Sequence, residues 1–367
     1  MDFESIPFWL YPVGFLLMLG PLVVLHELGH YLVGRWFGVG AEAFSVGFGR
    51  EIAGYTDSRG TRWKLSALPL GGYVQFKGDM NPASMPDPAA PKEDGAFQHA
   101  KLWQKALIVG AGPAANLLIA FLILFAFVMA FGKAVTPPVI ESFAEESVAQ
   151  EAGLLAGDRI VAIDGEPIDD FSDVQGLVAP YPGETIDIRV ERNGLERSVP
   201  VQIASIDMVD RFGNESRLGM LGVYAAAGER VDVGPIEGLG EAGVEIVRIT
   251  DMMVTGIGQI ITGKRSVKEL GGPITIAKLS GERLSLGWVE FAFFAALISL
   301  NLAFINLLPI PALDGGHLAF YAAEAIRGKP ASARSQEWAM RAGIAVVLAL
   351  MLFVTVIDIA KLPMFGS

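Results

Sequence analysis

Four long apolar segments constrain the fold more than any other feature of this sequence. They run approximately from Phe8 to Val33, Ala106 to Phe131, Val289 to Leu308 and Ala342 to Ile359. A helix of about 20 apolar residues crosses the hydrocarbon core of a bilayer. Because 52% of the residues are hydrophobic and only 19% are charged, we predict a polytopic α-helical membrane protein with four transmembrane helices.

The composition excludes several classes of function. The formal net charge of −12 argues against a nucleic-acid partner, because binding phosphates requires clustered Lys and Arg. The absence of cysteine excludes disulfides, cysteine nucleophiles and thiolate metal ligands. The first residues, MDFESIPFWLYPVG, have no basic stretch and no small-residue cleavage site, so we expect a retained membrane helix rather than a cleaved signal peptide.

Basic residues predict the orientation in the membrane. Lys and Arg are frequent between the first two apolar segments and between the last two, and none precedes Phe8. The positive-inside rule places basic loops in the cytoplasm. Both termini and the long connection from Gly132 to Trp288 are therefore expected outside the cytoplasm.

The loop after the first apolar segment reads as strands. In FSVGFGREIAGYTDSRGTRWKLSALPLGGYVQF, polar and apolar residues alternate, and DSRG and LGGY supply turns. The stretch is unusually apolar, so we expect a membrane-associated, re-entrant β-hairpin. The Pro-rich DMNPASMPDPAAPKEDG that follows is expected to be a linker.

The long external connection contains a compact α+β domain. In SVAQEAGLLAGDRIVAIDGEPI we predict a short helix, a turn at Gly157-Asp158, a strand at 159–163 and a hairpin turn at Asp164-Gly165. FSDVQGLVAPY then reads as a helix, and two strands flank Asn193-Gly194. This pattern resembles the PDZ domain of bacterial membrane and periplasmic proteases, which implies a periplasmic domain that binds an extended peptide by strand addition. The alternative is a spacer domain that binds nothing.

Apolar residues recur at helical spacing between Gly243 and Leu270. They predict either an amphipathic helix on the outer membrane surface or packing within the external domain. The resulting division of the chain is 1–35, first transmembrane helix; 36–103, cytoplasmic hairpin and linker; 104–131, second transmembrane helix; 136–225, PDZ-like domain; 226–287, juxtamembrane region; 288–320, third transmembrane helix; and 338–360, fourth transmembrane helix.

The chemistry is concentrated in the HELGH sequence of the first apolar segment. In a helix, His26 and His30 leave the same face one turn apart and can chelate one metal ion. Glu27 lies about 100° around the helix, where it can take a proton from the attacking water and deliver it to the leaving amine, as in HExxH zinc proteases. An accidental match with histidines packed against neighbouring helices is the alternative, but ionisable groups within a membrane usually serve function.

Zinc requires a third protein ligand. In LISLNLAFINLLPIPALDGGHLAF, two prolines interrupt an apolar helix, and Asp314 follows the interruption. His317, just beyond Asp314, is a competing candidate; because two histidines and a carboxylate suit the family that the motifs below resemble, His317 is expected to lie behind the ligands or to be structural. His99, in the polar EDGAFQHAKLW, is expected on the surface. The first and third segments both run from outside to inside in this topology, so we expect HELGH and Asp314 both toward the cytoplasmic side.

HELGH together with NLLPIPALDGG resembles the site-2 protease family of intramembrane zinc metalloproteases. GAGPAANLL, LPLGGYVQFKGD and VKELGGPITIAK also match, and with the PDZ-like insertion they resemble the subfamily of the regulator of sigma-E protease. The resemblance covers nearly the whole chain. One departure is that we find a single PDZ-like unit, whereas some members have two in tandem.

The resemblance implies a role for each matching residue. Zinc would be bound by His26, His30 and Asp314, with Glu27 as catalytic base. The substrate backbone would contact Asn306 and the interruption at Pro309 and Pro311. An extended substrate would pair with the hairpin at Gly71, Gly72 and Tyr73.

The implied function is cleavage of transmembrane segments of single-pass proteins in the bacterial inner membrane. An anti-sigma factor in envelope stress signalling is the expected substrate. Remnant signal peptides are an alternative substrate for the same chemistry. A non-catalytic membrane scaffold that presents a PDZ module is an alternative from another class.

Overall fold

The computed structural model describes residues 6–78, 94–209, 215–226, 228–263, 266–267 and 271–360. The chain forms two compact units. The helical unit comprises residues 1–123 and 272–358, and the strand-rich unit comprises residues 124–271 and 359–367. Residues 79–93 of the expected Pro-rich linker lie outside the described residues.

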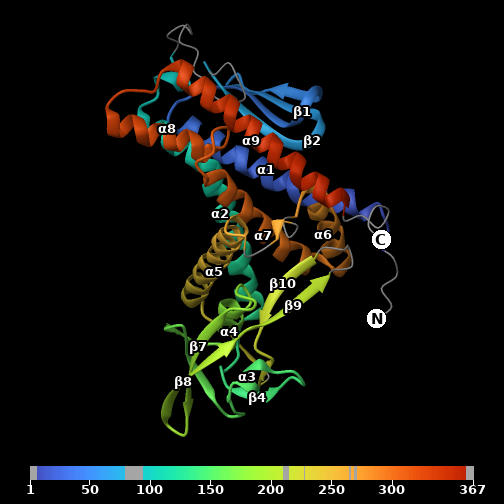
Figure 1. The fold of residues 1–367 in the computed structure, drawn as a ribbon. Helices are drawn as coiled ribbons and strands as arrows, with labels where there is room; N and C mark the ends of the chain where they lie inside the picture. Colours follow the sequence, from blue (N-terminus) through green and yellow to red (C-terminus); the bar gives the residue numbers. More distant parts are fainter. Residues whose placement is uncertain are drawn as a thin grey trace. The chain divides into compact units, whose positions relative to one another are not determined.

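Within the described part of the chain, four helices are long and apolar enough to cross a membrane. They are α1 (Leu10–Trp36), α2 (Leu102–Phe131), α7 (Trp288–Leu307) and α9 (Ala333–Ala360). At 1.5 Å per residue, even a helix of 20 residues is about 30 Å long, the thickness of the hydrocarbon core. The prediction of a multi-pass protein with four apolar helices is confirmed (Figure 1).

The third apolar segment is divided into two helices, as its prolines predict. Helix α7 ends at Leu307, and α8 (Asp314–Arg327) begins after the six residues 308–313. Pro309 and Pro311 lie in this interruption, where neither has to donate a helical hydrogen bond. The backbone of Gly315 lies against the carbonyl groups of Leu307 and Leu308, where a Cβ would come within 2.3 Å of both oxygens. The chain therefore turns sharply just where Asp314 begins the next helix.

The loop after α1 forms the expected hairpin of β1 (Ala41–Thr56) and β2 (Arg62–Phe76). Each strand bends, so that the hairpin builds four paired segments. Residues 41–46 pair with 72–76 on one side and with 62–65 on the other, and 51–56 pair with 62–66. Segment 72–76 is consequently an edge of this sheet. Phe44 and Trp63 pack with Tyr31 of α1 and hold the sheet on the helix.

Close backbone contacts join the helices of the helical unit. Gly29 of α1 lies against the carbonyl of Ala111 in α2, where a Cβ would be 2.4 Å from the oxygen. Gly14 makes a similar contact with Ser280 and Gly281 of α6 (Pro273–Leu286). Small residues at such crossings let membrane helices approach closely, so HELGH lies in a helix fixed on two sides.

Asp358 is a buried carboxylate within α9, 2% exposed. It accepts hydrogen bonds from the N–H groups of Gly272, Ile274 and Thr275 at 3.0–3.1 Å, and from the Thr275 hydroxyl at 2.8 Å. These N–H groups begin α6 and have no partner within that helix. Asp358 therefore caps α6 from another helix, which explains an acidic residue in an apolar segment.

The strand-rich unit contains the expected α+β domain. A four-stranded antiparallel sheet has the order β6-β5-β7-β8, and three further pairs join β4 to β11, β3 to β12 and β9 to β10. Its elements are β3 (Lys133–Val135), β4 (Ile140–Phe143), α3 (Val148–Glu151), β5 (Arg159–Ile163), β6 (Glu166–Pro167), α4 (Phe171–Val178), β7 (Thr185–Arg192), β8 (Leu195–Gln202), β9 (Ala204–Val209), β10 (Glu215–Met220), β11 (Val223–Ala225) and β12 (Glu229–Val231).

The turns of this domain follow the sequence closely. Asp164-Gly165 and Asn193-Gly194 both have positive φ values, 48° and 90° for the first pair and 54° and 76° for the second. Two successive positive φ values are those of a type I′ hairpin turn, for which Asp-Gly and Asn-Gly are favoured. The strands that they join bury alternate residues such as Ile188, Val190 and Val201 in one core.

An ion pair closes one end of this core. Asp158, whose side chain is 1% exposed, accepts hydrogen bonds from Arg192 at 2.6 and 2.7 Å and from the Leu155 N–H at 2.8 Å. Burial alone would raise the pKa of Asp158, but these hydrogen bonds outweigh it and hold the pKa below its usual range.

We expect Asp158→Asn to destabilise the strand-rich unit at neutral pH by about 3 kcal/mol, because Arg192 loses a buried partner. The lowered pKa of Asp158 stabilises the fold above its unfolded-state pKa of about 3.9, and this contribution is lost as pH falls through the folded-state pKa. Limited proteolysis of the unit in the full chain at falling pH should show wild type and variant converging in acid. The exposed Asp169→Asn is the control; equal protease resistance of all three proteins at pH 7 would contradict the expectation.

Helix α5 (Pro235–Ile261) includes much of the region from Gly243 to Leu270, for which the sequence predicts either an amphipathic helix or packing within the external domain. One face packs within the strand-rich unit: Gly238 lies against Phe125 and Met129 at the end of α2, and Gln259 donates a hydrogen bond to the Pro180 carbonyl. The other face leaves large apolar side chains exposed, among them Ile236, Val244, Val247 and Ile261. The helix thus packs on its domain and is also amphipathic.

Candidate metal centre

Two imidazoles of α1 form one half of the site. His26 and His30 are buried, and their Nε2 atoms are 3.2 Å apart. The Nδ1 atom of His30 lies 2.9 Å from the carbonyl oxygen of Ile108 in α2, to which an Nδ1–H can donate. A carbonyl at Nδ1 fixes the tautomer in which Nε2 keeps its lone pair, the form that binds metal.

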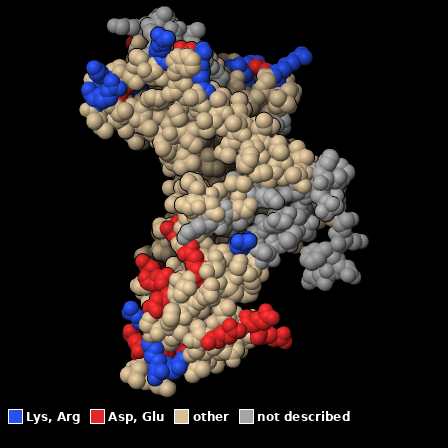
Figure 2. Space-filling view, viewed as in Figure 1, with Lys and Arg blue, Asp and Glu red and all other residues tan. Residues whose placement is uncertain are grey.

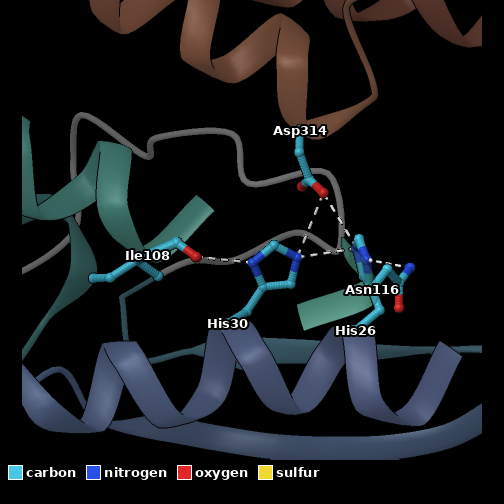
Figure 3. A network of polar contacts seen from close by, with 5 residues as sticks. All are labelled: His26, His30, Ile108, Asn116 and Asp314. Carbon is cyan, nitrogen blue, oxygen red and sulfur yellow. Dashed lines mark hydrogen bonds and ion pairs between the residues drawn. The ribbon is translucent and has the colours of Figure 1, made fainter. Parts of the chain in front are cut away.

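Asp314 supplies the other half from the first turn of α8. Its Oδ2 atom lies 3.2 Å from Nε2 of His26 and 3.5 Å from Nε2 of His30. Figure 3 shows the two imidazoles on one face of α1 pointing toward this carboxylate. The structure therefore brings together the three residues that the sequence nominated as metal ligands.

The three facing atoms fit a zinc ion. A tetrahedral zinc with ligand atoms at about 2.0–2.1 Å separates neighbouring ligand atoms by roughly 3.3–3.4 Å, close to the 3.2–3.5 Å found here. Asp314 Oδ2 is buried and has no hydrogen-bond partner. A proton can bridge one pair of these atoms, whereas a single cation satisfies all three.

The backbone on both sides makes the centre compact. Gly112 of α2 lies against the imidazoles, where a Cβ would be 2.2 Å from Nε2 of His30 and 2.8 Å from Nε2 of His26. Gly343 of α9 lies against the Pro311 carbonyl, where a Cβ would be 1.7 Å from the oxygen. Ala312, two residues before Asp314, has a φ of 87°, which is strained for a residue with a Cβ. The backbone of α2 thus lies directly against the imidazoles, and that of α9 lies against the segment that precedes Asp314.

A cavity of about 250 Å³ adjoins the three residues. Its lining includes Glu27, Gly72, Tyr73, Asn306 and His317, but not Gly71, Pro309 or Pro311. Val74 and Phe76 line it as well, so the edge segment 72–76 borders the cavity beside the expected catalytic base.

Of the two remaining histidines, one lies on the surface and the other lines the cavity. His99 is exposed at the end of a short 3₁₀ helix, η1 (Phe97–His99). His317 lines the cavity from α8 and is not part of the three-residue group found among the described residues.

Sequence reasoning missed the groups that contact the Nδ1 atoms of the two imidazoles. Asn116 of α2 is 0% exposed, and its Nδ2 atom lies 3.2 Å from Nδ1 of His26. Asn116 lies in GAGPAANLL, and a polar amide in an apolar helix is the sequence signal that could have found it. The Ile108 carbonyl carries no sequence signal, because every residue has one.

Comparison with known proteins agrees with the geometry. The family described as Peptidase family M50 matches residues 14–350. Proteins named as candidate zinc metalloproteases from Agrobacterium fabrum and Rhizobium meliloti are 43% and 44% identical, covering 96% and 94% of this chain and 96% and 95% of their own lengths. Metalloprotease MmpA of Caulobacter vibrioides is 33% identical, with 96% of this chain and 98% of its own length covered.

A solved PDZ domain of an SdrC-like protein from Listeria monocytogenes covers 25% of this chain and 92% of its own length. Its sequence identity is 18% and its TM-score is 0.19. That TM-score carries no conclusion about the domain.

Proposed function

Because the chain belongs to peptidase family M50, the site-2 protease family, and is a zinc metalloprotease, we propose that it cleaves transmembrane segments of single-pass membrane proteins. One observation carries this proposal: the three-residue centre is built on α1, one of the four apolar helices, and adjoins a cavity bordered by an unpaired strand segment. A peptide bond that reaches this centre must come from a chain within or beside the membrane. The non-catalytic scaffold is discarded, since the chain is an enzyme.

We assign each residue of the centre a role. His26, His30 and Asp314 would hold zinc, which supplies the Lewis acid that polarises the scissile carbonyl and makes water acidic at neutral pH. Glu27 accepts the proton of the attacking water and then donates it to the leaving amine.

Substrate binding follows from the edge segment. A transmembrane helix must unwind before its backbone can reach the centre, and an unwound chain needs partners for its N–H and C=O groups. Residues 72–76 have a strand partner on one side only within the described sheet, so the substrate can add as a further strand, with Gly71 at the bend and Gly72 and Tyr73 facing it. The Asn306 amide, which lines the cavity, and the backbone of the interruption at Pro309 and Pro311 would bind the substrate backbone as well.

A cleavage assay in proteoliposomes tests this function. The substrates are a single-pass reporter whose transmembrane segment contains Gly or Pro, a matched reporter with an all-Leu segment, and a remnant signal peptide. We expect cuts inside the membrane segment, detected by mass spectrometry, and faster cutting of the Gly/Pro reporter because its helix unwinds more easily. Cleavage confined to soluble regions of the reporters would contradict the proposal; preference for the signal peptide would support the alternative substrate.

We also propose the orientation inferred from the loops, with both termini and the PDZ-like domain in the periplasm of a bacterial inner membrane. In the face that Figure 2 shows, Lys and Arg of the helical unit gather at the end that carries α8 and the β1–β2 hairpin, as the positive-inside rule requires of a cytoplasmic end. We propose further that the PDZ-like domain binds an extended peptide and that the substrate is an anti-sigma factor.

The orientation can be tested directly because the chain has no cysteine. Cysteines introduced at the exposed Glu166 and Lys329 should differ in reaction with a membrane-impermeant maleimide applied to spheroplasts. We expect labelling of Glu166→Cys in intact spheroplasts and of Lys329→Cys only after their lysis. The reverse labelling pattern would contradict the proposed orientation and indicate the inverted one.

A further inference from the structure

The contact behind His26 raises a question of protonation. The Asn116 carboxamide is fully buried, with Nδ2 placed 3.2 Å from Nδ1 of His26, and its Oδ1 has no hydrogen-bond partner. If Nδ2 donates to Nδ1, the proton of the neutral imidazole must lie on Nε2. That Nε2 faces the Asp314 carboxylate and could not then bind a metal.

Rotating the carboxamide by 180° resolves this conflict. The oxygen and nitrogen of an amide side chain are nearly interchangeable in shape, and their assignment follows from the hydrogen-bond network. With Oδ1 against His26, an Nδ1–H donates to it and Nε2 keeps its lone pair. In the orientation placed here Oδ1 has no partner, so the rotation breaks no hydrogen bond at that atom and the contact with His26 decides.

The neighbouring histidine shows the same arrangement. Nδ1 of His30 faces a carbonyl oxygen of α2, that of Ile108, at 2.9 Å. Asn116 lies two turns further along α2 and presents its amide to Nδ1 of His26 (Figure 3). The backbone at Asn116 is itself held, because the Ser299 hydroxyl of α7 donates to its carbonyl at 2.8 Å.

We infer that Asn116 is a positioning residue whose carboxamide oxygen accepts the Nδ1 proton of His26 and so presents Nε2 to the metal. Helix α2 would thus set the tautomer of both histidines, one through a side chain and one through the backbone. This inference rests on the proposed zinc ligands.

Zinc affinity, measured by competition with a chromophoric chelator, tests the inference in the full-length purified protein. Asn116→Leu keeps the volume and removes the acceptor, so we expect zinc affinity to fall by about 10- to 100-fold, as for other partners of metal-binding histidines. Asn116→Asp keeps an acceptor and cannot donate, so we expect affinity at least equal to wild type. Leu118→Ala changes an exposed side chain of the same helix, so its affinity should be unchanged.

The spectrum of bound Co²⁺ provides a second readout. Wild type and Asn116→Asp should give the same tetrahedral spectrum, and Asn116→Leu should not. If Asn116→Leu bound zinc with wild-type affinity, the Asn116 side chain would serve packing only. If Asn116→Asp lost zinc affinity, the Asn116 Nδ2 group would be shown to donate to His26. Either result overturns the inference. If Asn116→Leu does not fold, Asn116→Asp alone decides. Failure of wild type to bind zinc would instead refute the zinc ligands themselves.

Discussion

Glu27→Gln is expected to reduce cleavage of a transmembrane reporter by at least about 100-fold, the lower end of what a general acid–base group contributes. The substitution replaces one carboxylate oxygen by an NH₂ group, so the side chain keeps its size but can no longer accept the proton of water. Glu27 is not one of the three clustered residues, and zinc content should therefore stay at the wild-type level. Product formation and zinc per chain are measured on the same preparation.

A matched control separates this role from a general effect of charge. Glu42 is an exposed glutamate at the start of β1, and Glu42→Gln should cleave at the wild-type rate. If Glu27→Gln cleaved at a rate close to that of Glu42→Gln, Glu27 would not be the catalytic base. Loss of zinc from Glu27→Gln would assign it to metal binding instead.

Gly112→Ala is expected to remove zinc from the protein. The added methyl would lie 2.2 and 2.8 Å from the two Nε2 atoms, far inside van der Waals contact, so the imidazoles must separate or turn. We expect zinc affinity to fall at least about 10-fold, the smaller effect known for changes around metal-binding histidines, and cleavage to be lost with it. Metal analysis after dialysis against a weak chelator measures the effect.

Gly110→Ala is the control for this substitution because it lies in the same helix and its Cβ would meet nothing within 4 Å. Both changes raise helix propensity by about 1 kcal/mol, so a difference between them reports on the site and not on the stability of α2. Equal zinc content in the two variants would show that Gly112 does not define the space between the histidines.

The elements that sequence predicted best are those fixed by local rules. The apolar segments, the spacing of His26 and His30, and the helix interruption before Asp314 follow from hydropathy, the helical repeat and the geometry of proline. The type I′ turn at Asn193-Gly194 likewise needs only its own two residues. For such features the tertiary structure has little to add.

Features that depend on contacts between distant segments could not be predicted. The division of the β1–β2 hairpin into four paired segments depends on where each strand bends, and alternation alone does not show this. Asn116, Gly112 and the Ile108 carbonyl act on the histidines because α2 crosses α1 at Gly29, a position that only the packed helices reveal. The sequence places Asp358 within an apolar segment, and only the structure shows that its carboxylate caps α6.

Zinc bound per chain in wild type and Asp314→Ala tests the central claim most directly. Two imidazoles from α1 and a carboxylate from α8 should bind one ion together, so purified wild type should hold about one zinc per chain, as expected for a catalytic site with three protein ligands. Asp314→Ala leaves only the histidines and should retain much less than one zinc after dialysis. Full zinc occupancy and wild-type affinity in Asp314→Ala would contradict the centre described here.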